Sequence, residues 1–260
     1  MRIVAVIPAR MASSRYPGKP LAPIRGLSMI EHVRRRTARC PALERVIVAT
    51  CDQAIMEEVQ RFGGEAVMTS DCHERCTDRV AEAVSRIPGL GMDDVVVNVQ
   101  GDMPLVRPEM LTALVEPFFH DPALLCCDLV SPLRSEEEYH SAHVVKVVGN
   151  LAGNALYYSR EAIPSLKKAP GSGLSGKNKQ LGIIAFRRHF LETFSALSPT
   201  PLEALESVDM MRPVEHGYPV RLVVTPYATV GVDTPADLGR AEALMLQDDL
   251  FPLYADSGRG

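Results

Sequence analysis

The chain has 260 residues, of which 46% are hydrophobic and 23% charged, and its formal net charge is −4. This mild negative charge argues against binding to nucleic acid or to a membrane surface, so any site for an anion must be local. No apolar run is long enough to cross a bilayer, and no signal peptide is expected. The six cysteines contain no CxxC pair, and Cys72-His73-Cys76 lacks a second pair of ligands at zinc-site spacing. We therefore expect reduced thiols and a cytoplasmic protein.

Apolar runs of strand length alternate with helical patterns over the first half of the chain. Strands are predicted at 3–7, 46–50, 66–68 and 94–99, and helices at 29–39, 53–62 and 78–86. This alternation is typical of an α/β protein with a doubly wound, mostly parallel sheet. We expect a single domain over residues 1–250.

The second half begins with strands that no long helix separates. They are predicted at 124–130, 144–148, 155–158 and 181–186, within a small lobe at about 124–190, and residues 167–179 are predicted to form a mobile loop. Helices at 189–196 and 202–211 and a strand at 220–225 follow. A last helix begins at the capping box of Thr234 and Asp237, and residues 251–260 are predicted to be a frayed tail.

The first strand stops at Pro8 and leads into a basic loop that carries Arg10, Arg15 and Lys19. The first 30 residues hold five basic side chains and no acidic one, although the whole chain is acidic. The loop matches neither the Walker A pattern nor GxGxxG. A buried strand that feeds a basic turn is nevertheless typical of a phosphate site in α/β proteins. The loop therefore indicates a polyphosphate ligand.

Two aspartates from distant segments complete this hypothesis. Asp102 follows the valine-rich strand and Gly101, and Asp233 precedes the cap residue Thr234. As an alternative, Asp102 would only cap the next helix, but Pro104 and Pro108 indicate that this helix begins further along the chain. Mg²⁺ usually takes one or two protein carboxylates and completes its shell with phosphates and water. We therefore expect a metal–triphosphate site at which an acceptor attacks the α-phosphate and pyrophosphate leaves.

With these segments in place, the chain resembles the CMP-Kdo synthetase (3-deoxy-manno-octulosonate cytidylyltransferase) family. The resemblance spans nearly the whole chain, and it is carried by IPARMASSRYPGKPL (7–21), VIVAT (46–50), Thr77-Asp78-Arg79, VNVQGD (97–102) and VDTPADL (232–238). It implies a nucleotidyltransferase-type α/β fold with a small dimerisation and acceptor lobe. It also implies CTP as donor, Mg²⁺ as cofactor, transfer of CMP to an acidic acceptor, and a homodimer.

The resemblance also implies roles for individual residues. Arg15, Lys19 and Asp102 would be catalytic, and Asp102 and Asp233 would hold the metal. CTP would contact Pro8, Ala9, Arg10, Arg15, Lys19, Asp52 and Gln100, and the acceptor would contact His73, Arg75, Thr77, Arg79, Gln180 and Asp209.

Departures from the family pattern fall at the acceptor positions. Arg75-Cys76 stands where the family has Ser-Gly, and Met103 stands where it has Glu. Gln180 and Ile184 replace a His and a Tyr, and the Glu-Gln pair of a later helix is lost. Because a polyhydroxylated sugar needs many hydrogen-bonding partners, these changes leave two acceptors open. One is Kdo or a related sugar acid, and the other is a small phosphonate such as phosphonoformate.

Overall fold

The computed structural model describes residues 1–12, 15–168 and 173–255. It divides into two compact units, one made of residues 1–112 with 229–260 and the other of residues 113–228. We call them unit 1 and unit 2. Part of the loop predicted at 167–179, and residues 256–260 of the predicted tail, lie outside the described residues. None of the described helices is long and apolar enough to span a membrane.

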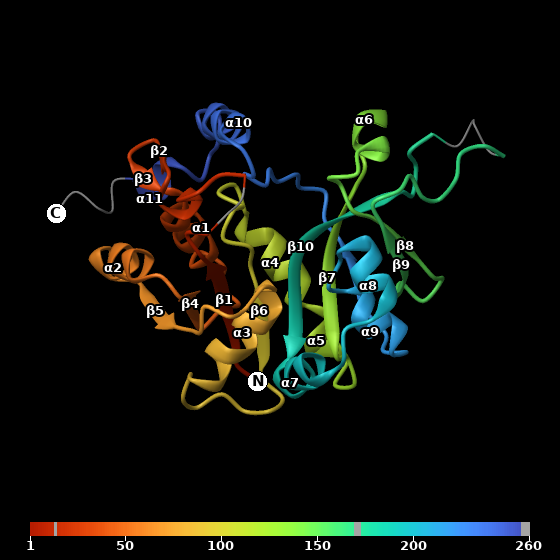
Figure 1. Cartoon of the computed structure of the whole chain (residues 1–260), viewed down its shortest axis with the longest axis horizontal. Coiled ribbons are helices and arrows are strands. Elements are labelled where there is room, and N and C mark those ends of the chain that lie inside the picture. Colours follow the sequence, from red (N-terminus) through yellow and green to blue (C-terminus); the bar gives the residue numbers. More distant parts are fainter. Residues whose placement is uncertain (13–14, 169–172, 256–260) are drawn as a thin grey trace. The chain divides into compact units, whose positions relative to one another are not determined.

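Unit 1 is built on a parallel sheet that the sequence predicts closely. Its strands are β1 (Ile3–Ala9), β4 (Arg45–Thr50), β5 (Glu65–Met68) and β6 (Val95–Asn98), in the order β6-β1-β4-β5 (Figure 1). The connecting helices are α1 (Met29–Thr37), α2 (Gln53–Arg61) and α3 (Cys76–Ser85). Every residue of β1 and β6 is buried, which explains their nearly continuous apolar runs.

The order of these strands determines where a ligand would bind. The chain passes from β1 to β4 and then β5 in one direction, and α3 returns it to β6 on the other side of β1. Because such crossovers are right-handed, this reversal places α3 on the opposite face from α1 and α2. Ligands of open α/β sheets bind at the carboxyl ends of the strands beside such a reversal. The ends of β1 and β6 are therefore the expected binding position.

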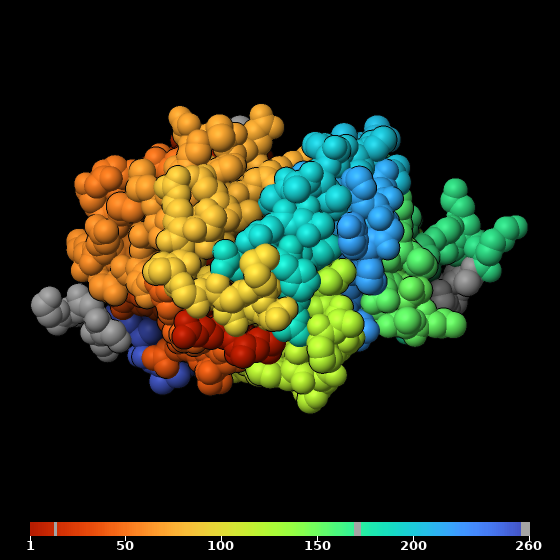
Figure 2. Space-filling model, turned by 90° about the horizontal axis from the view of Figure 1, so that it is seen from below, coloured from red at the N-terminus to blue at the C-terminus, as the bar shows by residue number. Residues whose placement is uncertain are grey.

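The outer helices of unit 1 form much of its visible surface. In Figure 2 one face of this unit is covered largely by orange and yellow residues, the part of the chain that runs from α2 to β6. Polar side chains of α2 such as Glu57 and Arg61 are exposed, whereas Ile55 and Val59 of the same helix are buried. The helix is thus amphipathic, with its apolar side toward the sheet.

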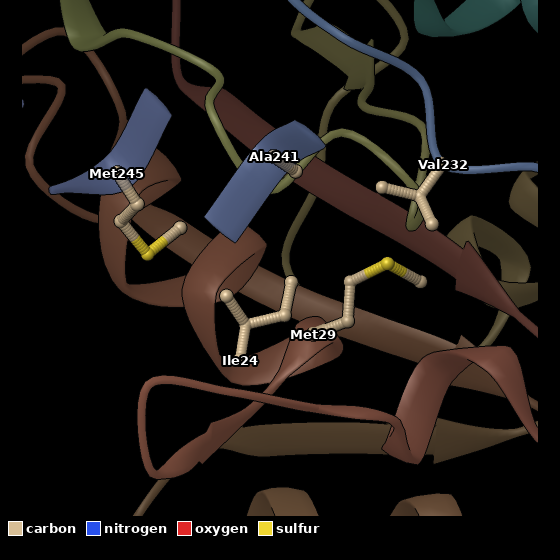
Figure 3. Packing of buried hydrophobic residues seen from close by; sticks show 5 residues of the cluster. All are labelled: Ile24, Met29, Val232, Ala241 and Met245. Atoms are coloured by element: carbon tan, nitrogen blue, oxygen red, sulfur yellow. The ribbon is translucent and has the colours of Figure 1, made fainter. Parts of the chain in front are cut away.

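The segment that follows unit 2 returns to unit 1 and packs on its opening segment. It contains α10 (Pro235–Met245), whose Thr234–Asp237 capping box confirms the prediction, and α11 (Pro252–Ala255). The opening segment adds η1 (Lys19–Leu21) and the hairpin of β2 (Pro23–Ile24) and β3 (Leu27–Ser28). Figure 3 shows the buried cluster that joins the two segments, formed by Ile24, Met29, Val232, Ala241 and Met245.

The prediction of a frayed tail from residue 251 is wrong as far as Ala255. Tyr254 is 2% exposed, and a chain of hydrogen bonds holds its hydroxyl. Arg36 Nε donates to Tyr254 Oη at 2.9 Å, Tyr254 Oη lies 2.8 Å from His32 Nδ1, and His32 Nε2 donates to the Ile24 carbonyl at 2.7 Å. Burial lowers the pKa of His32 to about 4, so the ring is neutral and its Nδ1 accepts from the tyrosine. These partners lie far from Tyr254 in the sequence, which is why local composition does not reveal them.

Unit 2 contains a mixed sheet of five strands in the part of the chain that the structure describes. They are β7 (Cys126–Pro132), β8 (Lys146–Gly149), β9 (Ala155–Ser159), β10 (Asn178–Arg187) and β11 (Arg221–Val224). β7 pairs in parallel with β11 and antiparallel with β10, while β8 pairs antiparallel with both β10 and β9. Its helices are α5 (Pro117–His120), α6 (Glu136–His140), α7 (Arg188–Ala196), α8 (Pro201–Glu206) and α9 (Met211–Glu215), and α4 (Pro108–Val115) spans the boundary.

The helix predicted at 202–211 is two helices. α8 ends at Glu206, the cap residue Ser207 that follows has a left-handed φ of 52°, and Val208 N donates back to the Glu203 carbonyl at 3.2 Å. The Arg160 side chain binds the last carbonyls of α8, at 2.7 Å to Glu206 O and 3.2 Å to Ser207 O. A side chain distant in sequence therefore replaces the intrahelical hydrogen bonds that a longer helix would need.

Candidate active site

The basic loop begins at the end of β1 and is held by two tight contacts. Asp52 Oδ2 accepts a hydrogen bond from Met11 N at 2.8 Å, and Gly18 N donates to Met11 O at 3.1 Å. Gly18 has a φ of 75°, a conformation that favours glycine, and it allows the chain to turn into η1. Asp52 thus anchors the loop, and although it precedes α2 its side chain makes no capping hydrogen bond to that helix.

Lys19 brings together the two predicted metal ligands. Its Nζ lies 2.8 Å from Asp102 Oδ2 and 3.3 Å from Asp233 Oδ1, and Arg15 Nη2 lies 3.0 Å from the same Asp233 oxygen. Burial opposes the charge of Lys19, but the two carboxylates outweigh this effect and raise the pKa of the ammonium. The site therefore holds a lysine that is charged at neutral pH between two aspartates.

The cluster in Figure 3 explains how Asp233 reaches this position. Val232 is fully buried against Ile24 and Met29, and its backbone N–H donates to the Asp102 carbonyl at 2.9 Å. The apolar side chain and this hydrogen bond fix the residue before Asp233. The two aspartates of the site are consequently joined through the backbone as well as through Lys19.

A cavity of about 350 Å³ lies at the carboxyl ends of β1 and β6, where the strand order predicts a ligand. It is lined by Pro8, Ala9, Arg10, Ala12, Arg15, Lys19, Pro20, Cys76, Gln100, Gly101 and Asp102. A Cβ at Gly101 would lie 2.7 Å from the Pro8 carbonyl, so only glycine allows the two strand ends to approach this closely. Of the residues predicted to bind the donor, only Asp52 is absent from this lining.

A smaller cavity of about 70 Å³ adjoins it through shared residues and contains most of the predicted acceptor positions of unit 1. It is lined by Pro8, Ala9, Arg10, His73, Glu74, Arg75, Cys76 and Arg79. Arg79 is 3% exposed and donates to Thr69 Oγ1 at 2.5 Å and to Ser70 O at 3.0 Å, while its Nη2 has no hydrogen-bond partner in the described structure. His73 is bound to Glu82, and Thr77 is buried in α3 instead of lining the cavity. A buried guanidinium nitrogen without a partner favours an anionic ligand.

The other predicted acceptor residues belong to unit 2. Gln180 lies in β10 and its Nε2 donates to Asp128 Oδ2 of β7 at 2.8 Å. Asp209 lies between α8 and α9, beside the buried Met210 and Met211.

The burial of Asp128 predicts how the free energy of unfolding depends on pH. It is 0% exposed, and burial raises its pKa from 3.8 to about 7. Between these values the folded protein holds a proton that the unfolded chain has released, so the free energy of unfolding falls as the pH rises from about 4 to about 7. Urea titrations across this range measure the fall. Asp128→Asn, whose amide oxygen still accepts from Gln180, should show a much flatter profile, and an unchanged profile would contradict the pKa assignment.

Sequence reasoning missed Cys76, Ala12, Pro20 and Gly101 as lining residues. Cys76 immediately precedes the Thr77-Asp78-Arg79 motif, and this position in the sequence is the signal that could have identified it as a lining residue. Among the described residues no group of three or more His, Cys, Asp or Glu side chains is placed to hold a metal.

The chain is similar to known proteins of one family. The sequence model of the family described as cytidylyltransferase matches residues 4–221. The 3-deoxy-manno-octulosonate cytidylyltransferase of Syntrophotalea carbinolica is 45% identical over 249 residues, 94% of this chain and 98% of that one. The protein of the same name from Syntrophobacter fumaroxidans is 46% identical over 248 residues, 95% and 98% of the two chains.

A solved structure gives the same result for the fold. CMP:2-keto-3-deoxy-manno-octonic acid synthetase complexed with CTP matches with a TM-score of 0.87 and 39% identity, covering 95% of this chain and 99% of that one. The fold is thus of the nucleotidyltransferase type, an α/β fold with a mostly parallel sheet, as predicted. The family match over most of the sequence and these close relatives lead to one conclusion: the chain belongs to the cytidylyltransferase family.

Proposed function

We propose that this protein transfers CMP from CTP to 3-deoxy-manno-octulosonate (Kdo) with release of pyrophosphate. The observation that carries the proposal is the placement of Lys19 between Asp102 and Asp233, at a cavity that Arg10 and Arg15 also line. The names of the relatives, which specify this acceptor, and the CTP in the solved relative support it.

The proposed reaction assigns the basic loop to the triphosphate. Arg10, Arg15 and Lys19 would bind its oxygens, and each charge-assisted hydrogen bond would contribute about 1.5–3 kcal/mol. A hydroxyl oxygen of the acceptor forms a bond to the α-phosphorus, and the bond from this phosphorus to the β-phosphate bridge breaks. The acceptor proton passes to solvent or base, and pyrophosphate leaves with the electron pair.

The site also fits Mg²⁺. Two carboxylates converge on one ammonium, so Lys19 stands in the position of a cation between Asp102 and Asp233. Mg²⁺ would be held by these two aspartates and by phosphate oxygens, and it needs no larger cluster of protein ligands. When bound, the ion would neutralise charge on the triphosphate. Lys19 would then turn toward the phosphates, because the cation replaces it between the carboxylates.

The comparisons lend no support to the alternative acceptor, a small phosphonate, because the relatives are named for manno-octulosonate across 92–95% of this chain. The predicted homodimer and the cytoplasmic location stay predictions.

The proposal is tested by measuring pyrophosphate release with purified protein, CTP and Mg²⁺. We expect turnover with Kdo, none without an acceptor, and little with phosphonoformate. Replacing CTP by ATP should abolish the reaction if the pocket selects cytosine. Absence of turnover with Kdo at saturating CTP and Mg²⁺, in a protein shown to bind CTP, would overturn the proposed acceptor.

A further inference from the structure

The six thiols differ sharply in accessibility. Cys40, Cys126 and Cys127 are at most 2% exposed, and burial raises the pKa of Cys127 to about 12. Cys51 is half-buried, and burial raises its pKa as well. Only Cys72 and Cys76 are exposed. Reactive thiols are accessible and lie in positive surroundings, so these two cysteines are the candidates for modification.

Cys76 has the surroundings that stabilise a thiolate. It is the first residue of α3, a helix of ten residues whose N-terminus lacks a side-chain capping bond from Arg75. The partial positive charge of a helix N-terminus lowers the free energy of an anion there. Cys76 lines both the larger and the smaller cavity, each together with Arg10.

A second observation points to an anionic ligand beside this thiol. Arg79, one turn along α3, lines the smaller cavity with Cys76, is 3% exposed and has an Nη2 without a hydrogen-bond partner in the described structure. The same cavity is also lined by two positively charged side chains, Arg10 and Arg75, and by one carboxylate, that of Glu74. The space that Cys76 faces therefore carries net positive charge.

Cys72, in the turn just before α3, offers a matched comparison. It is exposed like Cys76, but it lines neither cavity, and its Sγ accepts a hydrogen bond from Ser70 Oγ at 3.0 Å. The two thiols thus differ in their electrostatic surroundings more than in their access to solvent.

We propose that Cys76 is a site of reversible covalent modification by an anionic low-molecular-weight disulfide, and that the adduct closes the larger cavity to nucleotide. The Cys76 thiolate, having lost its proton to solvent, attacks one sulfur of the disulfide. A new sulfur–sulfur bond forms with Cys76, the original one breaks, and one thiolate leaves. Reduction by excess thiol reverses the step. The effect on catalysis, but not the modification itself, rests on the proposed function.

The first experiment measures which thiol reacts and with what charge preference. Wild-type protein, Cys72→Ser and Cys76→Ser are treated with anionic dithiobis(nitrobenzoate) and with neutral dithiodipyridine, and release of the leaving thiol is followed. We expect the anionic reagent to modify Cys76 at least about 10-fold faster than Cys72, with this preference falling at high salt. Equal rates for the two cysteines, or no difference between the reagents at Cys76, would overturn the proposal.

The second experiment uses glutathione disulfide and locates the adduct by intact mass and peptide mapping. In the Cys72→Ser variant we expect a single adduct on Cys76, and we expect this adduct to form more slowly when CTP is present. The rate of CMP transfer should fall in proportion to the fraction of protein that carries the adduct. Dithiothreitol should restore both mass and activity. If labelling is selective but CTP gives no protection, the donor site proposed above fails while the thiol assignment stands. If CMP transfer is robust but Cys76 stays unlabelled, the thiol assignment alone fails.

Discussion

Lys19→Met should lower kcat/KM for CMP transfer by roughly 10²–10³-fold, the range found when one preorganised charged or hydrogen-bonding group is removed from a transition state. Lys19 is the side chain that contacts both Asp102 and Asp233, and only 12% of it is exposed. Methionine keeps much of the length and apolar stem but removes the charge. Steady-state kinetics with varied CTP at saturating Mg²⁺ measures the loss.

The control for this variant is Lys168→Met, which removes an exposed lysine of unit 2. We expect wild-type kinetics from the control and an unchanged far-UV circular dichroism spectrum from both proteins. A Lys19→Met enzyme with a kcat/KM within a few-fold of wild type would contradict the role of this lysine at the triphosphate.

Arg212→Met is expected to reduce the free energy of unfolding by about 3–5 kcal/mol, because it leaves a buried carboxylate without its charge partner. Arg212 binds Glu203 through two hydrogen bonds of 2.8 and 2.7 Å, and the side chains are 5% and 1% exposed. The guanidinium also lies 4.8 Å from the centre of the Phe194 ring. Urea unfolding followed by circular dichroism gives the change.

The double variant Glu203→Gln, Arg212→Met separates loss of the partner from loss of packing. Glutamine retains an oxygen that accepts from Thr200 N in the capping box of α8, so the helix start is preserved. The double variant should be clearly more stable than Arg212→Met alone. If it is equally destabilised, packing rather than the uncompensated charge explains the effect.

The sequence predicts the sheet of unit 1 well because its signals are local. The valine-rich β6 and the apolar β1 show their burial in composition alone, and the glycine and aspartates that follow them mark the strand ends. The capping box at Thr234 is likewise contained within four residues. The three cations and two carboxylates of the site could therefore be proposed before the structure.

What the sequence misses depends on contacts between distant residues. Arg160 ends α8 by binding carbonyls that lie 46 and 47 positions away in the sequence. No pattern within residues 202–211 predicts this end of the helix. Tyr254 is held by side chains more than 200 positions earlier. Cys76 acquires its surroundings only when α3 is placed beside the end of β1. Tertiary partners, rather than weak local propensity, account for each of these differences.

The hydrogen-bonded chain through Tyr254 has a consequence for synthesis on the ribosome. Unit 1 consists of two separate stretches, and its second stretch supplies Val232, Asp233 and the partner of His32. Because domains fold as their residues emerge, the intervening residues 113–228 are complete before unit 1 can close. The nascent chain therefore leaves Ile24 and Met29 without their partners until Val232, Ala241 and Met245 are made. A ribosome stalled before residue 229 would hold a unit 1 that still lacks Val232, Asp233 and Tyr254.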